Sequence, residues 1–156
     1  MDLQLGPGLI GGAIGSALFT VAIVGSYLFA KEIWVHEVSG GEVPFEGTPR
    51  DYAWVAVILA SMLAGSVGTA WWVAATGGSF WEATLAAWWV QVAINVVDLV
   101  FIDIVLYQWI HPWFMQFDGI QPLKGTWPHV VGAIRGITVI GVPLALVSAG
   151  LAWAIA

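Results

Sequence analysis

The chain has no cysteine and few charged residues, and both deficits limit what kind of protein it can be. Without cysteine there is no disulfide framework, no thiolate zinc site and no cysteine nucleophile. Charged residues make up 9% of the 156 residues, whereas a soluble domain has about 25%. The four basic residues and a formal net charge of −6 offer little to nucleic-acid phosphates. We therefore exclude an ordinary soluble domain, a disordered chain and a nucleic-acid binder.

Hydrophobic residues, in contrast, make up 60% of the chain, which indicates an integral membrane protein. A membrane-spanning helix needs about 20 mostly apolar residues, and four stretches meet this requirement. The sequence predicts an all-α fold in which residues 1–156 form one transmembrane domain, an up-down bundle of four antiparallel helices. The N-terminal segment lacks a basic region, so we expect a retained first span rather than a signal peptide. The expected spans are residues 7–34, 50–76, 80–110 and 127–155.

Local signals at the ends of the second and third spans support this division. Thr48 is an N-cap candidate before a proline, with Asp51 in the first turn. Ser79 and Glu82 have the spacing of a capping box. Gly77 suits the left-handed position that ends a helix. We therefore expect a tight hairpin between the second and third spans.

Prolines divide the second half of the chain. Pro112 is expected to end the third helix near His111, because the residue before a proline avoids helical geometry. Thr126 is the expected N-cap of the fourth helix, and Pro143 is expected to kink that helix. The loop 112–126 is rich in apolar residues, so we expect it to lie in the interface or to tuck back against the bundle.

The basic residues predict an orientation. Positive residues favour the cytoplasmic side, which places loops 31–51 and 110–127 in the cytoplasm and both termini outside. We expect this topology in the plasma membrane of a prokaryote, the inner membrane where there are two. The four residues that carry the argument lie in or near these loops: Lys31, Arg50, Lys124 and Arg135.

Tryptophan and glycine indicate the contacts of the spans with lipid and with other helices. The eleven tryptophans concentrate near the ends of the spans, which is typical of aromatic belts in a lipid bilayer. Glycines at a spacing of four allow helix backbones to approach closely. We expect such glycine faces to serve a homo-oligomer or a larger membrane complex. The glycines are Gly8, Gly12, Gly132 and Gly136.

The third span carries most of a polar cluster within otherwise apolar helices. Gln91, Asn95 and Asp98 share one face of an α-helix, because their spacing is i, i+4, i+7. Asp103 is five residues further and should point about 140° away from Asp98. Arg135 lies at a similar expected depth on the fourth helix, so we predict that it pairs with Asp103 or Asp98. The second carboxylate would then serve as a structural pin or as a proton or ion site.

The histidines give a weaker signal. We expect His36, His111 and His129 at the cytoplasmic interface, each near a helix end, with Glu32 one turn before the first of them. These four residues are candidate metal ligands by type, but their spacing matches no dense metal motif. We therefore expect no bound metal and no cofactor.

Three classes of function stay open. The first expectation is an accessory or assembly subunit of a membrane complex, favoured by the glycine faces, the small size and the absence of catalytic motifs. The polar cluster instead favours an oligomeric proton- or ion-coupled transporter or channel. The third class is a membrane enzyme or a protein that binds lipid or a cofactor. Without a catalytic motif, enzyme activity is the least expected of these.

Overall fold

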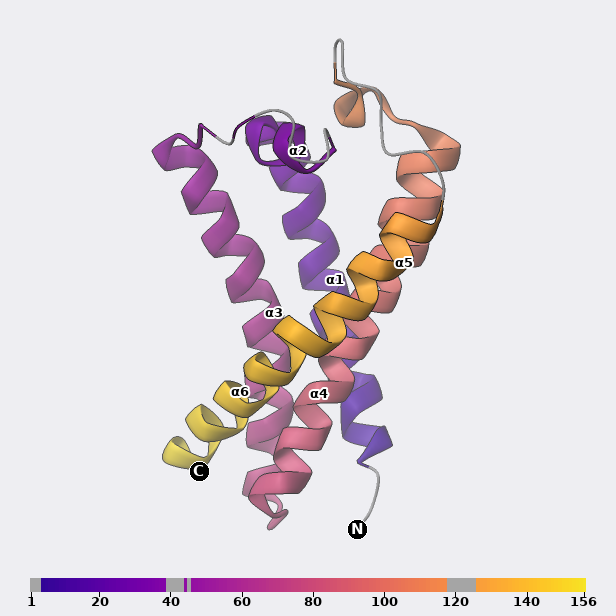
Figure 1. Ribbon diagram of the computed structural model, residues 1–156. Helices are drawn as coiled ribbons and strands as arrows, with labels where there is room; N and C mark the ends of the chain where they lie inside the picture. The colour runs from indigo at the N-terminus through magenta and orange to yellow at the C-terminus, as the bar shows by residue number, and fades with distance from the viewer. Residues whose placement is uncertain (1–3, 39–43, 45, 118–125) are drawn as a thin grey trace.

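In the computed structural model every regular element of the described residues, 4–38, 44, 46–117 and 126–156, is a helix (Figure 1). Two of the long helices contain π-helical segments, labelled η1 and η3, and η2 is a short 3₁₀ turn. Lys124 lies outside the described residues. In chain order the elements are α1 (Leu5–Phe29), α2 (Lys31–Val38), α3 (Pro49–Ala75), α4 (Phe80–Val97), η1 (Asp98–Ile110), η2 (Trp113–Met115), α5 (Thr126–Arg135), η3 (Gly136–Ile140) and α6 (Gly141–Ile155).

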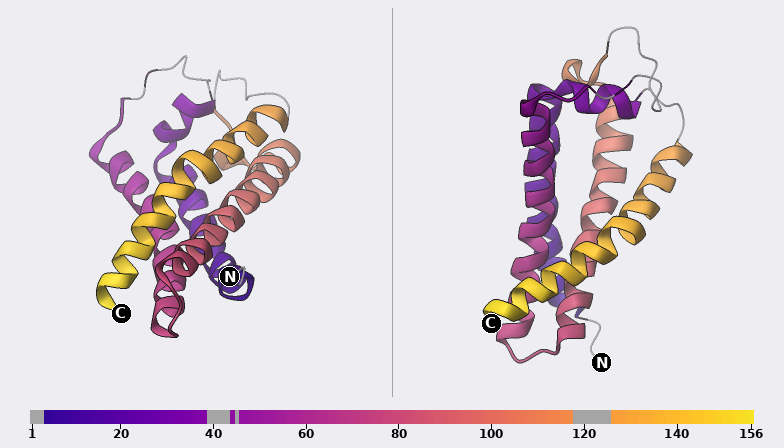
Figure 2. Two further views of the ribbon diagram at one scale, coloured as in Figure 1. Left: turned by 60° about the horizontal axis from the view of Figure 1, so that its bottom comes forward. Right: turned by 60° about the vertical axis from the view of Figure 1, so that its left-hand side comes forward.

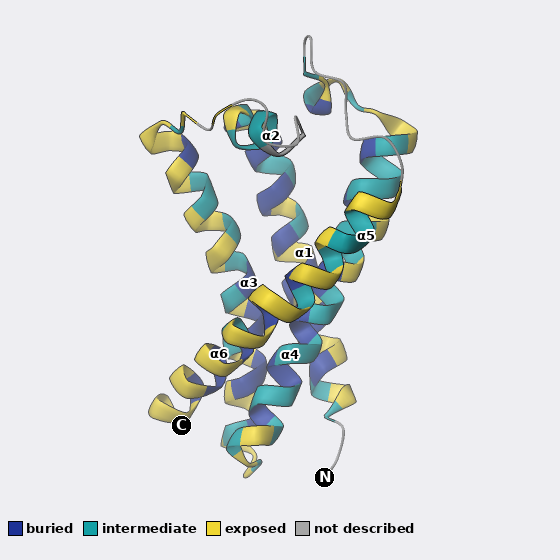
Figure 3. Ribbon diagram, viewed as in Figure 1, coloured by how far each residue is buried: buried dark blue, intermediate teal, exposed yellow. Residues whose placement is uncertain are grey.

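In the described part of the chain, four helices are long and apolar enough to cross a membrane. They are α1, α3, α4 continued by η1, and α5 continued by η3 and α6, so each predicted span corresponds to one of them. Most of their surface is apolar and exposed (Figure 3). Lipid can cover such a surface, whereas in water a large exposed apolar surface favours aggregation. Figure 1 shows both chain termini at the same end of the molecule.

The predicted N-terminal signals of α3 and α4 are confirmed. Thr48 caps α3 and accepts a hydrogen bond from Asp51 N, while the Asp51 carboxylate accepts one from Thr48 N. Ser79 and Glu82 form the same reciprocal arrangement at α4. Gly77 has a φ of 86° in the turn between these helices, a conformation that costs a glycine little.

The end of the first span differs from the prediction. The expected helix to residue 34 breaks at Ala30, and α2 turns across the end of the bundle (Figure 2). No proline or glycine marks this break, so the local sequence does not signal it. Trp34 holds α2 in place, since its Nε1 donates to Ser26 Oγ at 2.9 Å. Its ring also stacks on Tyr27 at 4.4 Å between centroids.

The helix ends around the second long loop are close to those expected. The third helix ends at Ile110, and His111 has a positive φ of 50° before Pro112. Thr126 is the first residue of α5 rather than the residue before it. Of the loop, residues 112–117 are described, and they tuck back against the bundle at η2, where Met115 is buried in the core.

The bundle is tight at one end and spread at the other (Figure 1). Near the α3–α4 turn the buried core is almost entirely alanine, from α3, α4 and α6. Small side chains let these helices approach closely. Toward α2 and η2 the core consists of large side chains, among them Phe19, Tyr27, Ile102 and Tyr107. There the helices diverge, and the cavity described below lies among them.

Three of the four glycines assigned to contacts between chains are used within this chain. A Cβ on Gly8 would lie 2.6 Å from Trp89 Cβ, and one on Gly12 would lie 2.7 Å from Ala93 Cβ. A Cβ on Gly136 would overlap the side chain of Asn95. Gly132 has no heavy atom within 4 Å of such a Cβ. Gly8 and Gly12 therefore allow a close approach of α1 to α4 within this chain, and a glycine face for an oligomer or a larger complex stays a prediction.

The last long helix contains the π-helical segment η3 just before Pro143. The amide of Gly141 donates to the carbonyl of Gly136, five residues back. Pro143 has no N–H to donate to the carbonyl four residues before it, so the α-helical hydrogen bonds are interrupted in this region. The predicted effect of Pro143 takes the form of a π-helical segment between two α-helical ones.

Candidate functional site

A cavity of about 440 Å³ lies between α1, α3, η1 and the α5–η3 helix. Most of its wall is apolar, with large side chains such as Phe19, Ile58 and Met62. Its polar lining comes mainly from η1 and α5, at the level where the helices diverge. Four members of the predicted polar cluster lie on this wall: Asn95, Asp98, Asp103 and Arg135.

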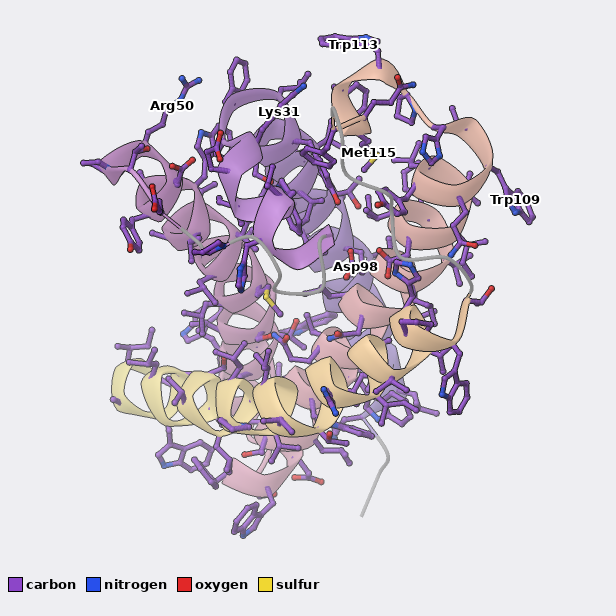
Figure 4. All side chains as sticks on the ribbon, turned by 45° about the horizontal axis from the view of Figure 1, so that its top comes forward. Lys31, Arg50, Asp98, Trp109, Trp113 and Met115 are labelled. Atoms are coloured by element: carbon purple, nitrogen blue, oxygen red, sulfur yellow. The ribbon has the colours of Figure 1, made fainter. Side chains whose placement is uncertain are left out.

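The π-helical geometry of η1 brings its two carboxylates to one wall. Asp98 and Asp103 are five residues apart, and an i to i+5 hydrogen-bond pattern stacks such residues on the same face. Both therefore line the cavity, and the predicted divergence of about 140° is wrong. Figure 4 shows Asp98 turned toward the space between the helices, whereas Trp109 on the same segment points outward.

Asp103 pairs with His129 and not with the predicted arginine. His129 Nδ1 lies 3.1 Å from Asp103 Oδ2, a hydrogen bond between η1 and α5. The two side chains are 12% and 25% exposed, respectively. The predicted pair of Asp103 with Arg135 is thus wrong. Arg135 lines the same cavity with an exposed side chain, and its pairing with Asp98 stays a prediction.

Gln91 belongs to the packing of the bundle rather than to the cavity. It is completely buried, and its Nε2 donates to Ser66 Oγ at 2.6 Å and to the carbonyl of Met62 at 3.2 Å. These bonds tie α4 to α3 in an apolar setting, as interhelical hydrogen bonds do in membranes. Gln91 therefore forms interhelical hydrogen bonds outside the cavity lining.

Asn95 links this packing to the cavity. Its Nδ2 donates to the Gln91 carbonyl at 2.8 Å, and its Oδ1 lies against Gly136 on the opposite helix. Because residue 136 has no Cβ, η3 lies close to this amide, which a Cβ at that position would displace. The side chain is 8% exposed and lines the inner end of the cavity.

The interface histidines do not gather into one site. His129 faces Asp103, His111 lies exposed after η1, and His36 and Glu32 lie on α2. Among the described residues no group of three or more His, Cys, Asp or Glu side chains is close enough to hold a metal ion. The four candidates therefore form no common metal site in that part of the chain.

The contact of His129 with Asp103 and the aromatic lining are the features of the site that the sequence did not predict. The spacing of His129 from Asp103 along the chain is long, so only the crossing of α5 over η1 brings the two together. Tyr27, Trp34 and Tyr107 close the end of the cavity nearest α2. The ring of Tyr107 lies 6.0 Å from that of His129 and 5.6 Å from that of His111.

Comparisons with models of known protein families, with curated proteins and with solved structures gave no match. The argument for function therefore depends on the cavity and on its lining residues.

Proposed function

We propose that the chain is an integral membrane protein, an antiparallel up-down bundle that binds a small molecule in its cavity within the bilayer. The observation that carries the proposal is a cavity of about 440 Å³ with carboxylates on one wall of otherwise apolar spans. Ligand sites commonly measure about 300–1,000 Å³ and combine apolar walls with a few polar groups. Ionisable residues at membrane depth are costly, and they commonly mark functional sites.

The placement of the carboxylates favours a ligand over a purely structural role. Gln91 shows what a structural pin looks like in this bundle, since it is enclosed and bonded directly to a neighbouring helix. Asp98 and Asp103 differ from Gln91 because both border the cavity and are partly accessible, even though Asp103 also bonds to His129 on α5. A bound molecule can reach them there.

Proton-coupled transport is a second candidate, and the Asp103–His129 contact favours it. A carboxylate and an imidazole at 3.1 Å can exchange a proton at the wall of the cavity. Such a group is what a carrier needs to couple ligand binding to proton movement.

The role of an accessory subunit stays a prediction with less support. It requires a surface for a partner chain, and Gly8, Gly12 and Gly136 make their contacts within this chain. The cytoplasmic placement of loops 31–51 and 110–127 also stays a prediction, as does the prokaryotic plasma membrane.

A cavity-filling substitution tests ligand binding directly. Gly132 lines the cavity and Gly150 lies on the outer surface of α6, and neither would bring a Cβ within 4 Å of another residue. We expect native mass spectrometry from lipid nanodiscs to show a small molecule on the wild type and on Gly150→Leu. Gly132→Leu should carry at least about tenfold less of this molecule, because the leucine side chain would occupy part of the cavity. A tenfold loss corresponds to 1.4 kcal/mol of binding free energy.

Two results would contradict the proposal. One is a wild type without any bound small molecule in every lipid composition tested. The other is equal occupancy in all three proteins, which would place the bound molecule outside the cavity. Because leucine favours a helix more than glycine does, both variants should fold, and their thermal stability provides the control.

A further inference from the structure

We infer that the ligand of this cavity is a lipid-soluble organic cation that enters from the bilayer through the side of the bundle. The inference rests on the proposed function, because it names the chemical class of the bound molecule. It depends on the charges of the lining residues, on their hydrogen-bond acceptors, on the aromatic wall and on the position of the rim.

The charge of the lining is negative. Asp98 and Asp103 contribute two carboxylates, and Arg135 contributes one positive charge. His129 donates from Nδ1 to Asp103, and its Nε2 is buried without a hydrogen-bond partner among the described residues. Two carboxylates and one guanidinium in the lining favour a cation over an anion.

The hydrogen-bonding groups at the inner end are acceptors. Asn95 uses its Nδ2 on the Gln91 carbonyl, so its Oδ1 is the atom left to bind a ligand. The Asp98 carboxylate is also an acceptor. The guanidinium of Arg135, the strongest donor of the lining, belongs to an exposed side chain. A cation suits this inner end better than a carboxylate or a phosphate does.

Aromatic rings add a second attraction for a cation. Tyr27 and Trp34 stack at 4.4 Å, and both line the cavity together with Phe19 and Tyr107. The face of an aromatic ring attracts a positive charge, by about 2 kcal/mol or more where water is excluded. The same rings provide an apolar surface for the body of the ligand.

Part of the rim of the cavity lies on the side of the bundle. Two of its apolar lining residues, Leu59 on α3 and Ile140 on η3, are 44% and 48% exposed. They lie on helices that are long and apolar enough to span a membrane, so lipid would contact this rim. A ligand with an apolar body can therefore reach the carboxylates without crossing the aqueous interface.

Two probes of the same shape and opposite charge test the inference. Binding of tetraphenylphosphonium and tetraphenylborate to the purified protein would be measured by equilibrium dialysis in an uncharged detergent, with protein-free micelles as the blank. The wild type should bind the cation at least about tenfold more tightly than the anion, a difference of 1.4 kcal/mol. Asp98→Asn should weaken cation binding by about tenfold, and Gly132→Leu should abolish it. Gly150→Leu should leave it unchanged.

A second variant keeps the test decisive if Asp98→Asn fails to fold. Arg135→Gln removes the positive charge of the lining from an exposed position, so it should strengthen cation binding severalfold, whereas a structural disturbance would weaken it. If tetraphenylborate binds and Gly132→Leu abolishes this binding, the assignment of the ligand as a cation is overturned. The proposal that the cavity binds a ligand then still stands. If neither probe shows saturable binding, the assignment of the ligand as a cation is also overturned. Ligand binding itself would then be decided by the native mass spectra.

Discussion

Replacing Gly65 by leucine is expected to lower the free energy of unfolding by about 3 kcal/mol, because overpacking against a fixed backbone costs about that much. A Cβ at this position would lie 2.8 Å from the Cα of Gly15 and 3.4 Å from the carbonyl oxygen of Gly11. Both contacts are backbone atoms of α1, so no side chain can rotate away. The helices α1 and α3 would have to separate where Gly65 faces Gly15.

Gly68→Leu is the matched control for this substitution. Gly68 lies one turn further along α3, is exposed and would bring a Cβ within 4 Å of no other residue. Its replacement should change stability little or raise it slightly, since leucine is the better helix former. Unfolding in detergent by increasing fractions of sodium dodecyl sulfate measures both variants. Equal midpoints for the two would show that α1 and α3 do not pack as described.

Breaking the Asp103–His129 contact is expected to destabilise the bundle by roughly 2 kcal/mol, the range for a hydrogen bond to a charged group. The two side chains lie 3.1 Å apart and are mostly buried, so removing either leaves a polar group with little access to water. The variants Asp103→Asn, His129→Gln and the double replacement form a mutant cycle. We expect a coupling energy of about 1–3 kcal/mol, as is usual for residues in contact.

A distant pair provides the comparison for this cycle. The substitutions are Asp103→Asn in η1 and Ser79→Ala at the N-cap of α4, and Ser79 forms its bonds with Glu82. Their effects should add within about 0.5 kcal/mol. An Asp103–His129 cycle that is equally additive would mean that the two side chains do not interact.

The helix ends could be predicted wherever a local signal fixes them. Thr48, Ser79 and Gly77 act within a few residues of their own position, through caps and a left-handed turn. The break at Ala30 has no such signal, because it depends on Trp34 folding back onto Ser26 and Tyr27. A tertiary contact of this kind leaves no periodic pattern in the sequence.

The polar wall of the cavity was predictable only in part. Asp98 and Asp103 stood out because carboxylates are rare in apolar spans, but their relative direction was wrong. The prediction assumed about 100° per residue, whereas η1 is π-helical and places residues five apart on one face. The local sequence of η1 contains no proline that would have indicated this geometry.

The prediction of Arg135 as the partner of Asp103 assumed that the axes of the third and fourth helices are parallel. Residues equally far from the ends of these helices would then lie at the same depth. That assumption selected Arg135, seven residues into the fourth span. The α5–η3–α6 helix instead crosses the bundle diagonally (Figures 1 and 2), so His129, nearer the start of that helix, lies beside Asp103. The crossing follows from the close contact of Gly136 with Asn95 and of Gly141 with Gln91, which the isolated spans do not reveal.

Protection of a single cysteine would test most directly whether the cavity takes a ligand. The chain contains no cysteine, so Gly132→Cys and Gly150→Cys each provide one reactive thiol, inside the cavity and on the outer surface of α6. The rate of reaction with a membrane-permeant maleimide would be measured with and without saturating tetraphenylphosphonium. We expect the cation to slow the reaction of Gly132→Cys by about tenfold or more, equivalent to 90% occupancy of the site, and to leave that of Gly150→Cys unchanged. Equal rates with and without the cation at Gly132→Cys would contradict a cation site in this cavity.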